Sequence, residues 1–144
     1  MDQVIDPRDE AEYRRRLAEG HLEMALKALR RGELPSSIQH SQLAAENAAK
    51  AIIAIYETPT WSHDPSPQLL EIEMRVDEEL RPSLRELAEI VGRLAPEHGR
   101  STYGEPDRGR TPWEIYTHRE AESILEDAER AVEIMRRLLG ELLG

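Results

Sequence analysis

The chain contains no cysteine and no phenylalanine among its 144 residues, and it has only two tryptophans and four tyrosines. Without thiols, disulfides and thiolate metal sites are excluded, which fits a reducing compartment. No apolar run reaches the ~20 residues that a membrane span requires. Residues 1–6 lack the charge pattern of a signal peptide. We therefore expect a cytoplasmic protein with no membrane contact, no cofactor and no metal.

Positive charge is also in short supply. The 19 lysines and arginines are outnumbered by 29 acidic residues, which leaves a net charge of −10. Such a surface repels a phosphate backbone, so broad DNA binding is excluded and any nucleic acid would need a local basic cleft. The length predicts a single domain over residues 1–144, with a core of aliphatic side chains.

Helix start and stop signals are present from the N-terminus onward. Asp6 is a suitable N-cap and Pro7 suits the first helical position, while Gly32 ends the apolar periodicity that follows. Residues 36–39 read Ser-Ser-Ile-Gln and match a capping box. They predict a second helix that reaches Tyr56.

The second half of the chain shows the same helical spacing with longer interruptions. Residues 66–96 carry a third helical region, which Pro82 can divide in two. Thr117 and Glu120 form another capping box and open the longest helix, which runs to the C-terminus. The proline-rich and glycine-rich stretches 57–67 and 98–116 are predicted to be irregular loops.

No segment alternates as a strand does, so the fold class is all-α. Four main helices, or five if Pro82 divides the third, each carry an apolar face. Short connections make neighbouring helices alternate in direction. We predict an up-and-down bundle of four to five helices.

The second predicted helix is apolar on one side and only half polar on the other. Gln42, Glu46 and Lys50 share the polar side with interspersed aliphatic residues. One interpretation is a solvated stripe held by a Glu46–Lys50 pair one helical turn apart. The other is an interface, where Gln42, Glu46 and Lys50 meet a second subunit or a partner protein.

The segment Gln42–Ile52 resembles the second-helix signature of HEPN domains, the higher eukaryotes and prokaryotes nucleotide-binding family. It departs from that signature at Leu43 and Asn47. Two other elements agree in order along the chain. Residues 63–64 (His-Asp) resemble the family's His-Asp-Leu step, and residues 100–103 (Arg-Ser-Thr-Tyr) resemble its Arg-Tyr-Pro element.

This resemblance implies a four- or five-helix bundle that forms a homodimer and can bind nucleotide. It also implies pairing with a small nucleotidyltransferase in a toxin–antitoxin arrangement. Some family members are metal-independent ribonucleases that use an arginine and a histidine separated by four to six residues.

Three arginine–histidine pairs can be compared with that ribonuclease pattern. Arg16 and His21 diverge by about 140° on a helix, and His21 is better explained as a core histidine with one hydrogen-bond partner. The second pair is Arg93 and His98, which straddles a proline and is expected by chance among so many arginines. His118 and Arg110 lie in the matching region, before the last helix, although seven residues separate them.

The catalytic candidates are therefore His118 with Arg110, or with Arg100. Histidine can move the proton of a 2′-hydroxyl, and arginine can stabilise the charge on phosphorus. The alternative is that His118 is an ordinary residue at a helix start, beside a solvated arginine-rich loop.

The same loop holds the candidates for phosphate or nucleotide binding, Arg100, Tyr103 and Arg108. Cationic side chains can neutralise phosphate, and an aromatic ring can stack on a base. The alternative is that the loop aromatics only attach the loop to the bundle.

Three hypotheses follow. The first is a dimeric HEPN-type interaction module that binds nucleotide and pairs with a nucleotidyltransferase. The second is a metal-independent ribonuclease, and the third is a structural helical protein whose partner alone is active. The sequence has no phosphate-binding glycine loop, nucleophile elbow, zinc-ligand spacing or Glu-x-x-His pair to support another chemistry.

Overall fold

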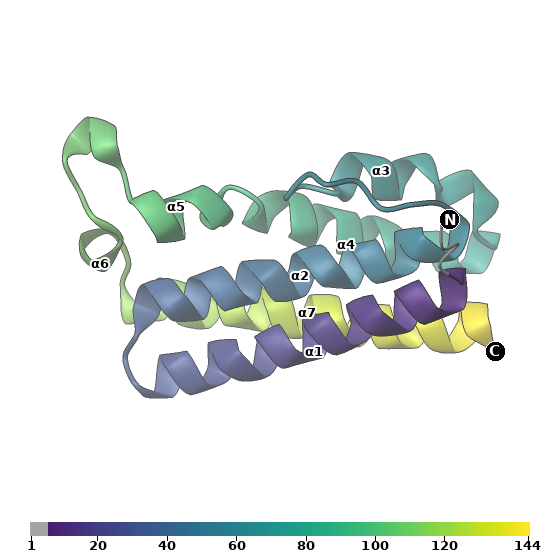
Figure 1. The fold of residues 1–144 in the computed structure, drawn as a ribbon, viewed down its shortest axis with the longest axis horizontal. Coiled ribbons are helices and arrows are strands. Elements are labelled where there is room, and N and C mark those ends of the chain that lie inside the picture. The colour runs from purple at the N-terminus through teal and green to yellow at the C-terminus, as the bar shows by residue number, and fades with distance from the viewer. Residues whose placement is uncertain (1–5) are drawn as a thin grey trace, which may run out of the picture.

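The computed structural model describes residues 6–144 as a bundle of four long helices joined by short helical turns (Figure 1). Residues 1–5, for which no signal peptide is predicted, lie outside the described residues. The long helices are α1 (Pro7–Arg30), α2 (Leu34–Tyr56), α4 (Arg81–Leu94) and α7 (His118–Leu143). The short ones are α3 (Ser66–Glu71), η1 (Glu73–Arg75), η2 (Glu78–Leu80), α5 (Glu97–Tyr103), η3 (Pro106–Arg108) and α6 (Pro112–Ile115).

Consecutive long helices run in opposite directions, so the start of α1 and the end of α7 lie at the same end of the bundle (Figure 1). Residues 6–144 form no strand, and their one β-bridge joins Glu105 to Arg110. The predicted all-α, up-and-down bundle is confirmed. None of the helices in this range combines the length and apolar character needed to cross a bilayer.

The ends of α1 and the start of α7 agree with prediction, but the start of α2 does not. Asp6 caps α1 and Thr117 caps α7, each accepting a hydrogen bond from a backbone N–H in the first turn. The predicted capping box at residues 36–39 is wrong, because α2 already begins at Leu34. The Ser37 hydroxyl is buried and donates to the Ala25 carbonyl at 2.8 Å, so it joins α2 to α1.

The middle of the chain is more helical than expected. Pro82 lies in the first turn of α4 and so divides the third helical region, as predicted. Residues 98–116, predicted to be an irregular loop, instead contain most of α5 together with η3 and α6. Such short helices show no measurable periodicity, and tertiary contacts hold them. The Tyr116 hydroxyl, for example, donates to the Glu97 carboxylate at 2.6 Å.

Gly104 ends α5 with φ +71°, a conformation that side chains rarely adopt. A Cβ at position 104 would also overlap the Arg110 carbonyl oxygen. We expect Gly104→Ala to lower the free energy of unfolding by about 1–3 kcal/mol from backbone strain alone. Urea denaturation measures this loss. Gly109→Ala is the matched control, since Gly109 has φ +65° but open space around it, and it should cost less.

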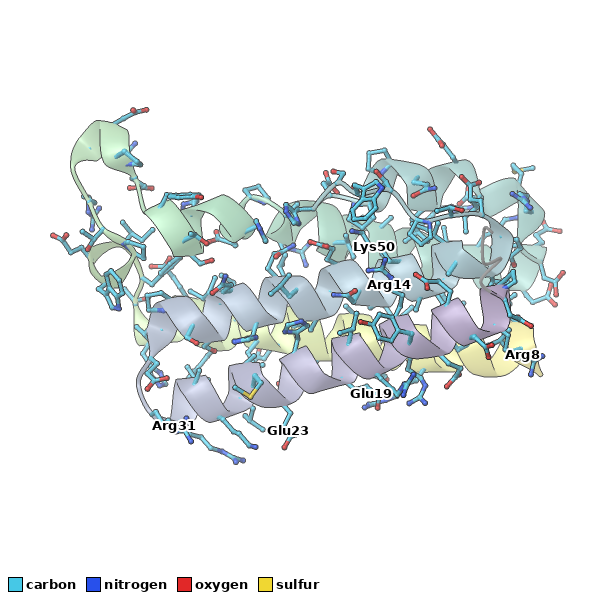
Figure 2. The ribbon with its side chains drawn as sticks, in the orientation of Figure 1. Arg8, Arg14, Glu19, Glu23, Arg31 and Lys50 are labelled. Carbon is cyan, nitrogen blue, oxygen red and sulfur yellow. The ribbon has the colours of Figure 1, made fainter. Side chains whose placement is uncertain are left out.

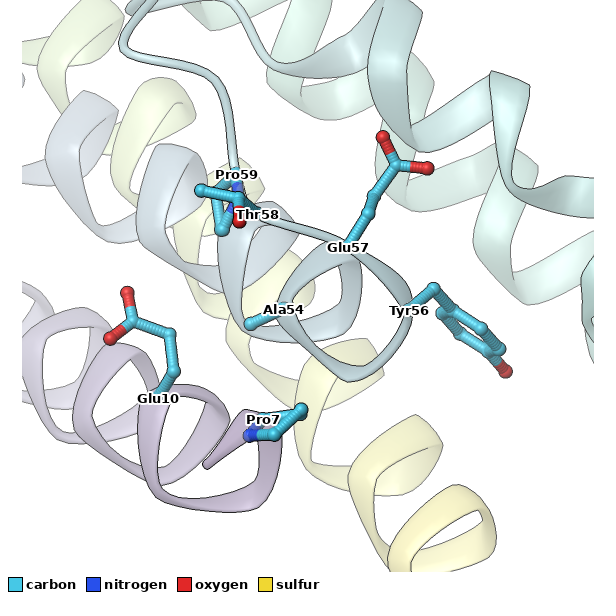
Figure 3. Close-up of a pocket in the computed structure, with 7 residues that line it drawn as sticks. All are labelled: Pro7, Glu10, Ala54, Tyr56, Glu57, Thr58 and Pro59. Carbon is cyan, nitrogen blue, oxygen red and sulfur yellow. The ribbon is translucent and has the colours of Figure 1, made fainter. Parts of the chain in front are cut away.

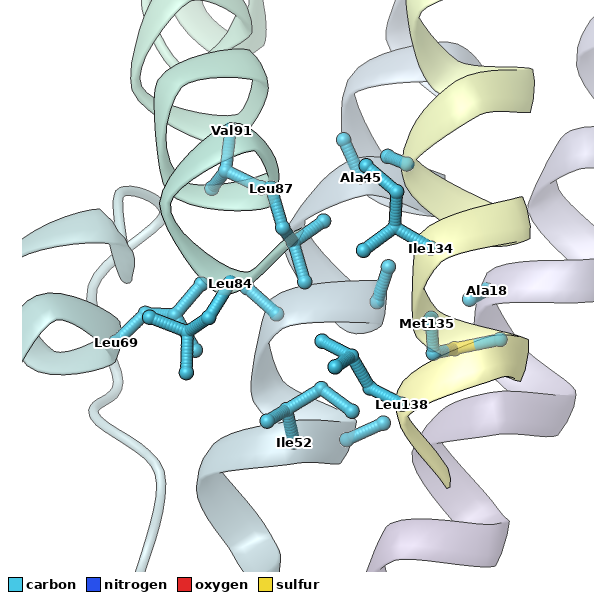
Figure 4. Packing of buried hydrophobic residues seen from close by; sticks show 14 of the residues in the cluster. Ala18, Ala45, Ile52, Leu69, Leu84, Leu87, Val91, Ile134, Met135 and Leu138 are labelled. Carbon is cyan, nitrogen blue, oxygen red and sulfur yellow. The ribbon is translucent and has the colours of Figure 1, made fainter. Parts of the chain in front are cut away.

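Helix α2 lies at the centre of the bundle, in contact with α1, α4, α5 and α7. Its alanines Ala44, Ala48 and Ala51 are fully buried, and their small size lets the neighbouring helices approach closely. Larger side chains from α4 and α7, such as Leu87 and Leu138, belong to the same core and pack near Ala45 and Ile52 of α2 (Figure 4). Residues from both the apolar and the polar side of α2 are buried.

His21 finds one hydrogen-bond partner, as predicted, and that partner is His40 of α2. The two Nδ1 atoms lie 3.0 Å apart, so one ring must donate and the other must accept, and at least one imidazole is neutral. Burial lowers the pKa of both histidines, and the charge of His40 lowers the pKa of His21 further. The folded protein therefore resists protonation of this pair.

A pH dependence of stability follows from this pair. Because both folded-state pKa values lie below the unfolded value of about 6.5, the unfolded chain binds more protons as the pH falls through that value. We expect the free energy of unfolding to fall between about pH 7 and pH 5. Denaturation at several pH values measures it, and His40→Gln should flatten the curve. An equally steep curve in that variant would contradict this assignment.

Candidate functional site

Gln42, Glu46 and Lys50 follow one another at single-turn spacing along α2, and all three are buried within the chain itself. Their exposed fractions are 1%, 5% and 4%. The Gln42 amide donates to Glu46 Oε1 at 3.0 Å, and the Lys50 ammonium donates to Glu46 Oε2 at 3.0 Å. Figure 2 shows Lys50 on α2. The segment that follows α2 turns back and runs along this helix (Figure 1).

The burial of this row can be compared with the two interpretations of its polar side, a solvated stripe or an interface with a partner. The predicted Glu46–Lys50 pair is present, but it is not solvated. The chain's own segment 57–65 and α5 cover the row. The interface role of Gln42, Glu46 and Lys50 stays a prediction, and in this conformation a partner would first meet the histidines above them.

Two histidines from different segments lie over the row. His63, in the segment after α2, donates from Nδ1 to Glu46 Oε1 at 3.1 Å. His98, in the first turn of α5, donates from Nδ1 to Gln42 Oε1 at 2.9 Å. The two imidazole rings stack with centroids 3.6 Å apart and planes 18° from parallel. We call Gln42, Glu46, Lys50, His63 and His98 the histidine cluster.

The charges in the histidine cluster are set by burial and by hydrogen bonds. Burial by itself raises the pKa of Glu46, but the hydrogen bonds from Gln42, Lys50 and His63 outweigh it and bring that pKa below its usual value. Burial and the nearby His63 lower the pKa of His98, although Glu46 acts in the opposite direction. Glu46 is therefore an anion at neutral pH, and His98 is a neutral imidazole.

This arrangement leaves one nitrogen of each ring for chemistry. Both Nδ1 atoms are engaged by α2, so the Nε2 atoms are the ones that remain to exchange protons with a ligand. The His63 side chain is 55% exposed, so a ligand can reach it. One atom each of Glu46, His63 and His98 also lie within 4.8 Å of one another, close enough to bind one metal ion together.

Trp61 lies two residues before His63, and it is 96% exposed. A tryptophan that buries almost none of its surface contributes nothing to the core. Its neighbours in sequence are small and polar, and the backbone N–H of Ser62 donates to the Thr60 hydroxyl at 3.1 Å. The ring is available to stack on a planar ligand beside the histidine cluster.

The predicted catalytic pair is placed elsewhere. His118, the first residue of α7, lies 2.9 Å from Glu122 and is exposed. Arg110 donates to the Glu114 carbonyl at 2.7 Å. No hydrogen bond among the described residues joins Arg110 to His118, so their joint role stays a prediction.

The predicted phosphate-binding residues are mostly paired with acids of their own loop. Arg100 bonds to Glu97 and, at 3.2 Å, to Glu105, and its guanidinium lies over the Tyr116 ring. Arg108 lies 3.8 Å from the same Glu105. Tyr103 is exposed. A phosphate would have to compete with these carboxylates, and the role of Arg100, Tyr103 and Arg108 stays a prediction.

Arg93 and His98, the second pair considered, point to different neighbours. Arg93 bonds to Asp127 of α7 at 3.2 Å, whereas His98 bonds to Gln42 of α2. The arginine–histidine spacing therefore did not identify a joint site here.

Sequence reasoning did not select His63 or His98 as site residues. The His-Asp step had flagged position 63, and the structure gives Asp64 a local role, because its carboxylate accepts hydrogen bonds from Ser66 at the start of α3. Positions 46, 63 and 98 have no spacing in the sequence that would link them. They meet only because the segment after α2 and the start of α5 fold over α2.

A separate pocket lies between the start of α1 and the end of α2 (Figure 3). Its lining residues are Pro7, Glu10, Ala54, Tyr56, Glu57, Thr58 and Pro59. The charged groups among them are carboxylates, and none is a cation, so this pocket does not suit a phosphate-bearing ligand.

Comparison with known proteins gives two findings. A family model described as "HEPN domain" matches residues 11–138. A protein of Methanocaldococcus jannaschii named "Putative toxin MJ1304" is 30% identical over 131 residues, which cover 88% of this chain and 86% of that protein.

Proposed function

This chain belongs to the HEPN domain family. From that membership and from the histidine cluster, we propose that it is a toxin-like module that cleaves RNA without a metal ion. The observation that carries the proposal is the pair of stacked histidines, each held at Nδ1 by a buried side chain of α2. The toxin-like character is supported by the similarity to the archaeal protein, whose name includes "toxin".

The two histidines differ in ways that suit opposite halves of an acid–base reaction. The Gln42 carbonyl oxygen fixes His98 as the Nδ1–H tautomer, so its Nε2 carries a lone pair and can accept a proton. His63 takes the role of proton donor in this proposal, because its Nδ1 bond to the Glu46 carboxylate holds the ring and leaves Nε2 to carry the proton that is given up. Lys50 holds the far oxygen of that carboxylate and keeps it in position.

RNA supplies a substrate on which both halves can act. His98 accepts the proton of the 2′-hydroxyl as the 2′-oxygen bonds to phosphorus. The bond from phosphorus to the 5′-oxygen breaks, and His63 gives its proton to that oxygen. The products are a 2′,3′-cyclic phosphate and a 5′-hydroxyl, with no oxidant, metal or second substrate consumed.

The test is incubation of the purified protein with single-stranded RNA in excess EDTA. We expect cleavage that persists without divalent ions and yields 2′,3′-cyclic phosphate ends. A DNA oligonucleotide of the same sequence has no 2′-hydroxyl and should remain intact. Intact RNA under these conditions would overturn the proposal and favour the structural alternative, in which only a partner is active.

Trp61 is suited to stack on a base next to the bond that is cut. Stacking on an aromatic side chain is worth about 1–3 kcal/mol per base. We expect Trp61→Ala to raise KM for RNA at least about fivefold with little change in kcat. Trp113→Ala is the matched control, since Trp113 is also exposed but lies on α6. Equal effects of the two substitutions would contradict a specific role for Trp61.

Assembly is the other half of the proposed function. We infer that the protein forms a cytoplasmic homodimer and pairs with a small nucleotidyltransferase that restrains it, as the family resemblance implies. Binding of nucleotide through Arg100, Tyr103 and Arg108 belongs to the same proposal. Sedimentation at micromolar concentration tests the dimer, and co-purification with a co-expressed nucleotidyltransferase tests the pairing. A monomer that retains no such partner would contradict this half alone.

A further inference from the structure

Three residues of the histidine cluster that take part in the proposed acid–base reaction also form a set of metal-ligating groups. One donor atom from each of Glu46, His63 and His98 lies within 4.8 Å of the other two. These residues come from α2, from the segment after it and from α5. Because the three ligands come from three separate segments, they can approach one ion from different directions.

We propose that Glu46, His63 and His98 bind one divalent transition-metal ion, of which Zn²⁺ is the best example. Two imidazole nitrogens and one carboxylate oxygen form a donor set that Zn²⁺ accepts in tetrahedral sites, with water in the fourth position. Mg²⁺ and Ca²⁺ prefer oxygen ligands and do not suit this set.

The distance between two of the donors fits such an ion. His63 Nδ1 and Glu46 Oε1 are 3.1 Å apart and now share a proton. An ion about 2.0–2.2 Å from each can replace that proton, since Zn²⁺ binds nitrogen and carboxylate oxygen at these lengths. One ring nitrogen of His98 lies within 4.8 Å of these two atoms, and rotation of that ring out of its stack on His63 would turn the nitrogen toward the ion.

The surroundings of the carboxylate also fit a single bound ion. Lys50 occupies Glu46 Oε2, which leaves only Oε1 for the metal. Gln42 donates to Oε1 and fixes its direction, as the partners of metal-binding carboxylates commonly do. The ammonium charge of Lys50 opposes a second cation nearby, so we expect micromolar rather than nanomolar affinity.

Binding at this site has a consequence for the proposed reaction. An ion on Nδ1 of His63 takes the place of the proton, and the ring can no longer cycle between its acid and base forms. Zn²⁺ should therefore inhibit RNA cleavage. This inhibition rests on the proposed function, whereas the binding itself rests only on the geometry of the three ligands.

The experiment uses the full chain, freed of metal by EDTA and dialysed. Calorimetric titration with Zn²⁺ should give one ion per chain. Co²⁺ added instead should develop the intense visible absorption of a tetrahedral site. His63→Ala and His98→Ala should each weaken Zn²⁺ binding at least tenfold, and thermal unfolding followed by circular dichroism shows whether each variant is folded.

His40→Gln is the matched control, because it removes an imidazole of the other histidine pair and leaves the three ligands in place. It should bind Zn²⁺ as the native chain does. The inference is overturned if the native chain takes up no stoichiometric Zn²⁺, or if folded His63→Ala and His98→Ala variants bind it unchanged. Loss of binding in His40→Gln would place the ion at the other pair.

The binding and the cleavage can fail separately. Zn²⁺ uptake by a chain that leaves RNA intact supports the metal site and overturns the proposed ribonuclease. Cleavage in EDTA by a chain that binds no Zn²⁺ does the reverse. Cleavage that Zn²⁺ leaves unchanged at saturating binding would contradict the shared site.

Discussion

Replacing His98 or His63 by alanine should lower the rate of RNA cleavage by about 10²–10⁴-fold, the range typical for removal of a general acid or base. Both rings are held by α2 at Nδ1, which leaves Nε2 of each for the proposed reaction. The chemical step loses either its proton acceptor or its proton donor. Single-turnover kinetics with a labelled oligonucleotide isolates that step from binding and product release.

The double variant provides a sharper measurement than either single one. Residues that act as a unit have strongly non-additive effects, so removing both histidines should cost little more than removing one. His118→Ala separates this site from the one predicted at the start of α7. Loss of cleavage in His118→Ala, with His63→Ala and His98→Ala still active, would move the chemistry to Arg110 and His118.

Lys50→Met should lower the free energy of unfolding by about 3–5 kcal/mol, which is the usual cost of removing one member of a buried ion pair. Methionine keeps most of the length of the side chain but has no charge. The Glu46 carboxylate, 5% exposed, would then lose its main counter-charge. Urea denaturation of the native chain and the variant measures the difference.

The double variant Glu46→Gln with Lys50→Met tests the reason for that loss. A neutral amide needs no counter-charge, so the double variant should recover part of the stability that Lys50→Met loses. If both proteins were equally unstable, the cost would come from lost packing rather than from an unpaired charge.

The long helices could be predicted because each carries its own local signals. Asp6 and Thr117 cap helices through contacts within three residues, and the apolar spacing of α7 is an i, i+3, i+4 pattern that any bundle requires. The start of α2 was misplaced because Gly32 turns the chain within two residues, so the helix begins before the serines. The short helices α5 and α6 were not predicted, because tertiary packing holds them and they are too short to show an apolar periodicity.

The sequence by itself determined the all-α class, the family and the row Gln42, Glu46 and Lys50, since one-turn spacing on a helix fixes which residues share a side. It could not decide what covers that row. Only the tertiary structure did so, because it placed His63 and His98 above Glu46 from positions 17 and 56 residues away from their α2 partners. Within this chain, the polar row that the sequence left as either solvated or facing a partner is the buried floor of the histidine cluster. That result depends on the packing of three segments, which no local pattern records.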